Sequence, residues 1–345
     1  MQYKTLGNTG LLVSQICLGT MTFAGGEGIW KAIANVDQSG ADILIKNSIH
    51  AGVNFIDTAD VYSDGLAETI LGQSLRNLNI SRKDVVIATK AFGRVGPGRN
   101  DVGASRGHLL DAVDASLKRI GTDYIDLYQI HGTDLVTPIE ETLRALDTLV
   151  SQGKVRYIGV SNWQAWRIMK AAGISQLKNL ASFDTLQAYY SIAGRDLERE
   201  IVPLLEDQKM GLLVWSPLAG GLLSGKYTRD HQKPEDSRRS SFDFPIVDKE
   251  RTWKIMDVLI PLAKARNVSA ATVSLAYVLS KPFVTSVIIG AKRPDQLAEN
   301  LAAADLVLSE GELKQLDEAS ALPPEYPEWM IPFQNRNRLE DIPRF

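Results

Sequence analysis

Short apolar runs alternate with segments that carry helix start and stop signals along most of this chain, and this alternation constrains the fold more than any other feature. Eight runs are candidate strands, at residues 14–18, 53–56, 85–89, 124–130, 155–160, 185–190, 211–215 and 286–289. Each run is apolar on both faces, which is typical of parallel strands covered by helices. Seven intervening segments are candidate helices, at residues 42–52, 65–78, 105–121, 138–153, 162–172, 196–209 and 248–266.

This repeated alternation predicts an α/β fold, a (β/α)8 TIM barrel. A doubly wound parallel sheet is the alternative. We expect one barrel domain over residues 1–345, because barrels of this class commonly carry insertions within a single unit. The barrel should include a long loop at 220–248, after the seventh strand, and an extended C-terminal tail at 321–345.

Smaller signals mark the two ends of the predicted barrel. Two short apolar segments, 3–6 and 11–13, flank a turn and predict an N-terminal β-hairpin. Ser309 and Glu312 have the spacing of a capping box and predict the start of a last helix before the tail.

The composition is that of an ordinary soluble protein, with 38 basic and 41 acidic residues, and it favours neither nucleic acid nor a membrane surface as a partner. Cys17 is the only cysteine, so neither an intrachain disulfide nor a thiolate metal cluster can form. The chain starts without a signal-peptide pattern and has no run of membrane-spanning length, so we expect a cytoplasmic protein.

Four residues with complementary acid–base chemistry stand at or just beyond the ends of three successive apolar runs. Asp57 and Tyr62 follow the second run, Lys90 the third and His131 the fourth. In a barrel these ends share one mouth, where neighbouring strands lie about 5 Å apart. An ammonium at Lys90 would favour the Tyr62 phenolate and lower its pKa, and Asp57 would keep the lysine charged. Tyr62 is then a general acid, with His131 as a donor to a substrate carbonyl.

Structural roles compete with this interpretation residue by residue. Asp57 could be a helix cap, and Tyr62 could merely pack in a turn. Gly220 to Lys226 has the glycine and lysine spacing of a phosphate loop, but Tyr227 replaces the magnesium-binding Ser or Thr, which disfavours an NTPase. The other histidines lack metal-ligand spacing with His131, so no metal is expected.

Longer motifs in order along the chain resemble the aldo-keto reductase family. They lie at residues 57–62 (DTADVY), 117–131 (LKRIGTDYIDLYQIH), 159–162 (GVSN), 215–218 (WSPL) and 289–300 (IGAKRPDQLAEN). The likeness runs from Tyr3 to about Ser320 and is closest to the larger bacterial-type branch, which includes aryl-alcohol reductase-like and potassium-channel β-subunit-like members. It implies a (β/α)8 barrel that binds NADPH and reduces aldehydes or ketones, with Asp57, Tyr62, Lys90 and His131 as the catalytic tetrad.

The resemblance also implies which residues would bind NADP. Ser161, Asn162 and Gln187 would hold the nicotinamide carboxamide, Trp215 would stack on the ring, and Thr20 and Met21 would lie near the ribose. The pyrophosphate would be lined by Ser216, Pro217, Leu218, Gly220 and Lys226, closed over by Arg238 or Arg239. The adenosine end would be held by Gly290, Lys292, Arg293, Gln296, Glu299 and Asn300.

The two cations Lys292 and Arg293 favour NADP over NAD on charge as well as by resemblance. Aromatic residues just after strand ends suggest a substrate pocket for flat or apolar carbonyls. Its candidate wall residues are Phe23, Trp30, Phe92, Trp163 and Tyr190, with Trp329 reaching the mouth from the tail. Two departures from the family pattern, Ser63 and the segment 132–134, put the substrate identity in doubt.

We therefore predict NADPH-dependent reduction of aldehydes or ketones, with a small-molecule carbonyl partner and with homo-oligomerisation left open. The alternative is an NADP-binding sensor or regulatory subunit with slow turnover. A lyase or isomerase would need a metal or a Schiff-base lysine, and Asp57 disfavours the latter by keeping Lys90 protonated.

Overall fold

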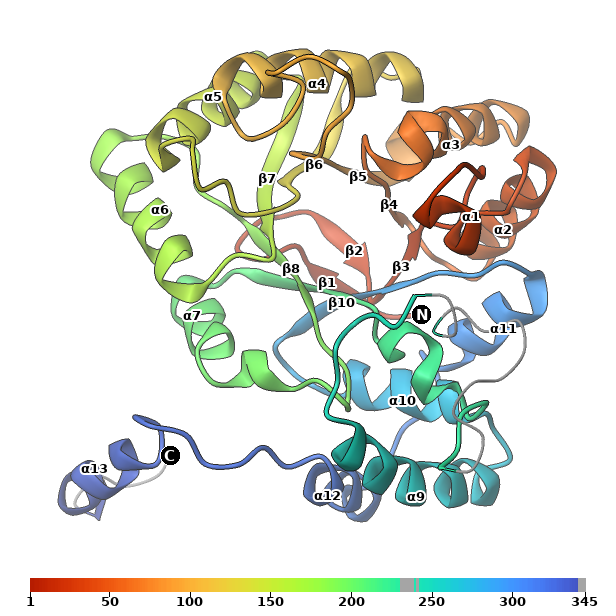
Figure 1. Cartoon of the computed structure of the whole chain (residues 1–345), viewed down its shortest axis with the longest axis vertical. Coiled ribbons are helices and arrows are strands. Elements are labelled where there is room, and N and C mark those ends of the chain that lie inside the picture. The colour runs from red at the N-terminus through yellow and green to blue at the C-terminus, as the bar shows by residue number, and fades with distance from the viewer. Residues whose placement is uncertain (230–238, 240–241, 341–345) are drawn as a thin grey trace.

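The computed structural model describes residues 1–229, 239 and 242–340. Eight parallel strands close into a barrel in the order β10-β3-β4-β5-β6-β7-β8-β9 (Figure 1). These are β3 (Ile16–Gly19), β4 (Phe55–Asp57), β5 (Val86–Ala91), β6 (Ile125–Ile130), β7 (Val155–Ser161), β8 (Thr185–Tyr189), β9 (Gly211–Trp215) and β10 (Val284–Ile289). Each overlaps a predicted strand, so the predicted TIM barrel is confirmed.

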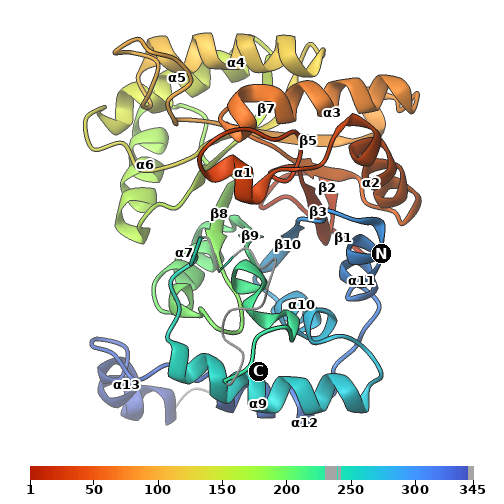
Figure 2. The ribbon, with the colours of Figure 1, turned by 45° about the vertical axis from the view of Figure 1, so that its right-hand side comes forward.

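Helices surround the barrel and cover the outer face of its strands (Figure 2). The described helices, in chain order, are α1 (Ile29–Ile33), α2 (Gln38–His50), α3 (Leu66–Asn77), α4 (Arg106–Ile120), α5 (Ile139–Ser151), α6 (Ala165–Lys178), α7 (Ile201–Gln208), α9 (Lys249–Ala265), α10 (Ala270–Leu279), α11 (Pro294–Ala302), α12 (Glu310–Ala319) and α13 (Met330–Glu340). Short 3-10 turns lie at Tyr62–Gly65, Arg82–Asp84, Asp196–Glu198 and Ala219–Ser224. Within this described part of the chain, no helix is long and apolar enough to cross a membrane.

Local capping chemistry sets several of these boundaries. The Ser105 hydroxyl accepts a hydrogen bond from the His108 amide at the start of α4, and Gly121 ends the helix at a φ of 75°. The predicted capping box of Ser309 and Glu312 is present at the start of α12. Asp37 caps α2, which therefore begins four residues before the predicted segment 42–52.

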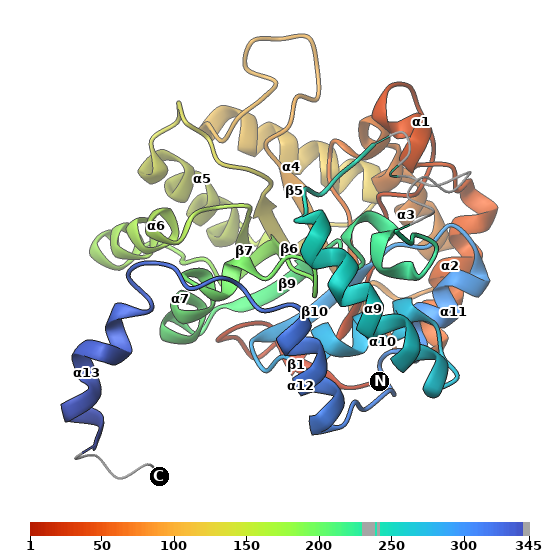
Figure 3. The ribbon, with the colours of Figure 1, turned by 60° about the horizontal axis from the view of Figure 1, so that its bottom comes forward.

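Among the described residues, four helices lie outside the predicted set. The α10 helix is buried on nearly every side, so it lacks the one-sided apolar pattern by which a helix is recognised. The α1 helix has five residues and α11 nine, which is short for periodicity to be read. The fourth, α13, lies in the tail and projects beyond α12, away from the barrel (Figure 3).

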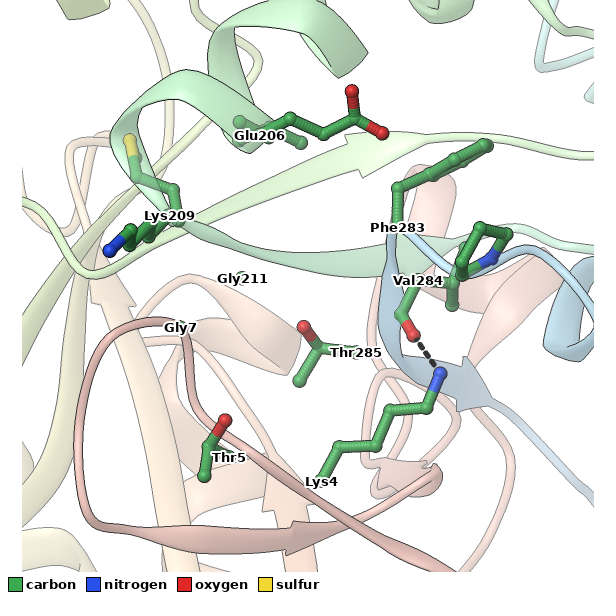
Figure 4. Close-up of a pocket in the computed structure, with 12 residues that line it drawn as sticks. Lys4, Thr5, Gly7, Glu206, Lys209, Gly211, Phe283, Val284 and Thr285 are labelled. Carbon is green, nitrogen blue, oxygen red and sulfur yellow. Dashed lines mark hydrogen bonds between the residues drawn. The ribbon is translucent and has the colours of Figure 1, made fainter. Parts of the chain in front are cut away.

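The N-terminal end of the barrel is closed by the predicted hairpin, formed by β1 (Tyr3–Thr5) and β2 (Leu12–Ser14). Gly7 lies in the turn between these two strands at a φ of 60°, and a Cβ there would lie 2.2 Å from the Asp184 carbonyl oxygen, so only glycine fits. A hollow of about 480 Å³ opens beside it, where the Lys4 ammonium donates to the Val284 carbonyl at 2.6 Å (Figure 4). It contains none of the acid–base residues Asp57, Tyr62, Lys90 and His131. These residues lie at the carboxyl ends of the strands, which form the opposite end of the barrel.

Candidate active site

The three strands that carry the acid–base residues are neighbours in the barrel, as predicted. Strand β4 pairs with β5, and β5 pairs with β6, all in parallel. Asp57 is the last residue of β4, Lys90 lies near the end of β5, and His131 directly follows β6. The carboxyl ends of these strands therefore bring the carboxylate, the ammonium and the imidazole to the same end of the barrel.

Lys90 is the centre of the cluster and is fully buried. Its ammonium donates to the Asp57 carboxylate at 2.5 Å, to the Thr58 carbonyl at 2.8 Å and to the Tyr62 hydroxyl at 3.2 Å. These three acceptors match the three N–H donors of a lysine, so the buried charge is fully hydrogen-bonded. The Tyr62 oxygen accepts this bond from Lys90, so the Tyr62 O–H is left to donate to another acceptor.

Tyr62 reaches Lys90 because of an unusual turn. The segment Tyr62–Gly65 holds Ser63, Asp64 and Gly65 at φ values of 48°, 55° and 86°. Left-handed conformations at two residues other than glycine cost energy and persist only where the surroundings impose them. Here the Ser63 hydroxyl donates to the Phe23 carbonyl at 3.1 Å, which ties the turn to the chain after β3. Ser63, a departure from the family pattern, thus has a hydrogen-bonding role at a strained position.

The pKa values of Tyr62 and Lys90 differ from the expectation in one respect. Burial raises the pKa of Tyr62 above its ordinary value, and the Lys90 ammonium opposes this without cancelling it. The prediction of a net lowered pKa was therefore wrong, although Lys90 acts in the predicted direction. Burial also lowers the pKa of Lys90, but Asp57 and Tyr62 outweigh burial and raise it above the ordinary value. The ammonium stays charged throughout the physiological range.

His131 lies against the other side of the tyrosine. The two rings meet edge to face, with centroids 5.8 Å apart. Burial, followed by the charge of Lys90, lowers the pKa of His131 to about 3. The imidazole is therefore neutral at physiological pH and can donate one N–H without adding charge.

A second polar cluster lies inside the barrel, on the far side of Asp57 from Lys90. The Gln187 amide nitrogen donates to Asp57 Oδ2 at 2.9 Å and to Gln129 Oε1 at 3.3 Å. The Gln129 amide nitrogen also donates to Asp57 Oδ2, at 3.3 Å. Asp57, Gln129 and Gln187 thus form a closed triangle of hydrogen bonds, in which Asp57 Oδ1 remains paired with Lys90.

The residues that the resemblance assigns to nicotinamide lie together across the mouth. Ser161 ends β7, Asn162 follows it at a φ of 61°, and Trp215 ends β9. The Trp215 indole N–H donates to Asn162 Oδ1 at 3.0 Å. Trp215 also stacks on Phe244 with centroids 5.7 Å apart and an interplanar angle of 9°.

The loop after β9 is held in a tight conformation at Ala219–Ser224. Gly220 donates its amide to the Ser216 hydroxyl at 2.9 Å, and a Cβ at Gly220 would lie 2.3 Å from the Phe244 carbonyl oxygen. The Arg239 guanidinium donates to the Ala219 carbonyl at 2.8 Å and the Pro245 carbonyl at 3.0 Å, and it pairs with Asp243. Of the two arginines expected to close over the pyrophosphate, Arg239 bonds the loop itself, and Arg238 lies outside the described residues.

The residues assigned to the remaining cofactor positions occupy several elements. Thr20 is buried after β3 with Met21 half-buried beside it, Pro217 and Leu218 precede the 3-10 turn, and Lys226 is exposed after it. The adenosine set gathers around the start of α11: the Lys292 amide donates to Gln296 Oε1 at 3.0 Å, and Asn300 donates to the Gly290 carbonyl at 3.3 Å. Arg293 pairs with Asp295 at 2.9 Å, and Glu299 is exposed on the same helix.

The candidate substrate wall is partly as expected. The Trp30 ring meets Tyr62 edge to face at 5.9 Å, and Phe92 lies where a Cβ at Gly132, next to His131, would contact its ring at 2.9 Å. Trp163 is mostly buried and donates to the Gly132 carbonyl at 2.9 Å. Trp30 thus contacts Tyr62 directly, whereas Phe92 and Trp163 lie against Gly132, the residue after His131.

Three other expected wall residues lie elsewhere. Phe23 is fully buried in the core, since its segment turns inward directly after β3. Tyr190 is also fully buried, where its hydroxyl donates to Glu198 at 2.5 Å and its ring packs on Phe283. Trp329 is 54% exposed in the C-terminal tail and packs edge to face on Tyr326.

Three residues near the site were missed by sequence reasoning. Tyr189 and Phe244 both contact the Trp215 ring, and Gln129 belongs to the buried triangle. Gln129 had a readable signal, because it is the one amide within the run Ile125–Ile130 and shares its side of the strand with His131. Phe244 had none, because its position depends on how a long loop folds back.

Comparison with known proteins agrees with this geometry. The sequence model of the aldo/keto reductase family matches residues 15–321, and the chain belongs to this family. A probable voltage-gated potassium channel subunit beta of rice is 38% identical over 89% of this chain and 92% of its own length. A versiconal hemiacetal acetate reductase of Aspergillus parasiticus is 35% identical, and an uncharacterized oxidoreductase of Bacillus subtilis is 34% identical. Each of these two alignments covers 92% of this chain and at least 95% of the relative.

Proposed function

We propose that this protein reduces aldehydes or ketones to alcohols with NADPH, and that Tyr62 gives the proton. The observation that carries the proposal is the position of Lys90, whose buried ammonium bonds both the Asp57 carboxylate and the Tyr62 hydroxyl. As the proton leaves Tyr62, negative charge grows on an oxygen 3.2 Å from a fixed cation. Such preorganised charge is more effective in a dry site than in water.

His131 would be the second donor to the carbonyl oxygen. Its pKa of about 3 keeps the imidazole neutral, so it can orient the substrate without competing with Tyr62 as the acid. The two rings lie in edge-to-face contact, so their polar groups can serve one carbonyl oxygen. A carbonyl oxygen held there would accept one hydrogen bond from each residue.

The described residues fit a nicotinamide cofactor. Both hydrogens of the Gln187 amide are used inside the barrel, so its carbonyl oxygen is the atom left to accept from a carboxamide. Ser161, Asn162 and the Trp215 ring would complete that end of the site, and Arg239 would keep the loop after β9 close to the pyrophosphate. When bound, NADPH supplies the hydride. The side chains of the protein then need to supply only the proton.

We infer a preference for NADP over NAD from the start of α11. Lys292 and Arg293 precede a helix N-terminus, where positive side chains and backbone N–H groups both favour a phosphate. Asp295 in the first turn pairs with Arg293 and reduces its share of this effect. Lys292 and Arg293 together would supply the charge that favours the 2′-phosphate.

The aromatic surroundings of Tyr62 support flat or apolar carbonyl substrates. The Trp30 ring contacts Tyr62, and Phe92 and Trp163 lie against Gly132, next to His131. Aromatic aldehydes should be reduced with a higher kcat/KM than glucose-like aldehydes, because the latter would leave their hydroxyls unpaired against these rings. Equal or better reduction of the sugars would contradict the preference.

The test of the central proposal follows NADPH absorbance at 340 nm with aromatic and aliphatic aldehydes, comparing the unmodified protein with Tyr62→Phe. We expect reduction by the unmodified protein and loss of at least 100-fold in kcat for the variant, roughly the contribution of a general acid. NADPH binding, followed by protein fluorescence, should be retained. Retained activity in Tyr62→Phe would show that Tyr62 is not the proton donor.

The similarity to a probable potassium channel subunit favours a second candidate, an NADP-binding regulatory subunit with slow turnover. It predicts tight NADPH binding without reduction of any aldehyde in a broad panel. The single cysteine, which is free and buried, supports a cytoplasmic setting for either candidate.

A further inference from the structure

Gln129 has no assigned part in the proposed reaction, yet it touches two residues that do. It is fully buried on β6, in register with Lys90 on β5 and with Gly159 on β7. Its amide bonds Asp57 Oδ2 and accepts from Gln187. A buried polar side chain costs free energy unless its hydrogen bonds are made, so its retention in an otherwise apolar run calls for a local cause.

The neighbouring strand makes room for this side chain. A Cβ at Gly159 would lie 3.2 Å from Gln129 Cγ and 2.4 Å from the Thr185 hydroxyl oxygen. A larger residue at 159 would therefore push Gln129 out of the triangle. The small residue on β7 and the long amide on β6 together place the Gln129 head group beside Asp57, at the layer of the barrel just below the mouth.

The two oxygens of Asp57 have different partners. Oδ1 accepts from the Lys90 ammonium, whereas Oδ2 accepts from Gln187 and Gln129. Donors to a carboxylate offset part of its negative charge. With one donor fewer, Asp57 would act more strongly on Lys90 and on Tyr62, and the Gln187 amide would lose one of its two anchors.

We propose that Gln129 is a positioning residue that fixes Asp57 and Gln187 relative to each other, and so links the nicotinamide side of the site to the Lys90–Tyr62 proton donor. The inference rests on the proposed function, since it assigns the proton to Tyr62 and the carboxamide to Gln187. Gln129 itself touches neither substrate nor cofactor in this arrangement.

Two effects distinguish this role from simple packing. Because the Asp57 charge raises the pKa of Tyr62, a less compensated Asp57 should raise that pKa further. Alcohol oxidation by NADP needs the Tyr62 phenolate. In a Gln129 variant, the increase of the oxidation rate with pH should therefore occur at a higher pH than in the unmodified protein. We also expect weaker NADPH binding, because Gln187 would be held by one bond instead of two.

The experiment compares Gln129→Met, which keeps the length of the side chain and removes both hydrogen bonds, with Tyr128→Phe. Tyr128 is the adjacent fully buried residue of β6, and its hydroxyl donates to the Leu109 carbonyl at 3.4 Å, away from the site. We expect Gln129→Met to shift the pH profile of alcohol oxidation upward by about 0.5 unit and to weaken NADPH binding about 3- to 10-fold. Tyr128→Phe should change neither, although both variants lower the melting temperature.

A double-mutant cycle with Gln187→Met sharpens the result. If the two amides act as one unit, the combined loss in NADPH affinity should be clearly smaller than the product of the single losses. An unshifted pH profile and unchanged NADPH affinity in folded Gln129→Met would overturn the inference while leaving the proposed reduction intact. An unmodified protein that binds NADPH but reduces no aldehyde would instead contradict the proposed function. The NADPH affinities of the unmodified protein and Gln129→Met would then decide the role of Gln129.

Discussion

The candidate site has cations at both ends, and their surroundings differ sharply. Lys90 is fully buried and donates to three fixed acceptors, whereas Lys292 and Arg293 lie on an exposed helix start, where Arg293 and Asp295 are 58% and 66% exposed. An electrostatic interaction is several times stronger near buried groups than in bulk water. The buried end is therefore suited to chemistry, and the exposed end to selecting among cofactors that bind by other contacts.

The strongest way to break this comparison is the same substitution at the two ends. Lys90→Met should reduce kcat for aldehyde reduction by about 100- to 10,000-fold, because Tyr62 loses the cation that stabilises its developing charge. NADPH affinity, measured by fluorescence titration, should stay within a few fold. A variant that folds, binds NADPH and keeps more than a tenth of the wild-type kcat would show that Lys90 is only a structural partner of Asp57.

Stability should follow the same division. Asp57→Asn leaves the Lys90 ammonium buried without its counter-ion, and we expect the free energy of unfolding to fall by about 3–5 kcal/mol in urea denaturation. Asp295→Asn removes the partner of Arg293 at the exposed end and should leave the denaturation midpoint unchanged. Equal losses in the two variants would contradict the distinction between the ends.

Strand ends could be predicted from the sequence because apolar runs mark them, and this placed Asp57, Lys90 and His131 on neighbouring strands. The net pKa direction of Tyr62 could not, because it depends on how deeply the turn at Tyr62–Gly65 is buried as well as on the nearby charge. Side-chain direction after a strand end was equally hidden. Phe23 and Trp30 follow the same strand, yet one is fully buried and the other lies against Tyr62.

Asp60 tests whether burial alone, without pairing, is costly near the chemical end. It is 2% exposed, and neither carboxylate oxygen has a hydrogen-bond partner among the described residues. Burial, followed by the charge of Glu68, raises the pKa of Asp60 to about 7 from an ordinary value of 3.8. The folded state therefore holds this proton more tightly than the unfolded chain, and stability from this group falls as pH rises from about 4 to about 7.

Asp60→Asn should remove that loss. We expect the advantage of the variant in free energy of unfolding to be about 1–3 kcal/mol larger at pH 8 than at pH 5, measured by urea denaturation of both proteins at both pH values. Asp126 is the matched control, because it is also buried but accepts from Arg82 at 2.5 Å and from the Ile87 amide at 2.9 Å. Asp126→Asn should destabilise at both pH values, and a gain at pH 8 in both variants would rule out pairing as the cause.

The smallest effect is expected at the exposed end itself. Lys292→Met should weaken NADPH binding about 2- to 5-fold while leaving NADH binding and kcat at saturating NADPH unchanged, because a solvated cation adds little to affinity and only one of the two cofactors carries the 2′-phosphate. The difference between the unmodified protein and the variant should shrink in 0.5 M salt, since exposed charges are screened over a few ångströms at that ionic strength.

A parallel loss of NADPH and NADH affinity would mean that Lys292 holds the α11 start in place, where its amide bonds Gln296, and does not bind the phosphate. A fall in kcat comparable to that of Lys90→Met would remove the functional distinction between the buried and the exposed cation altogether.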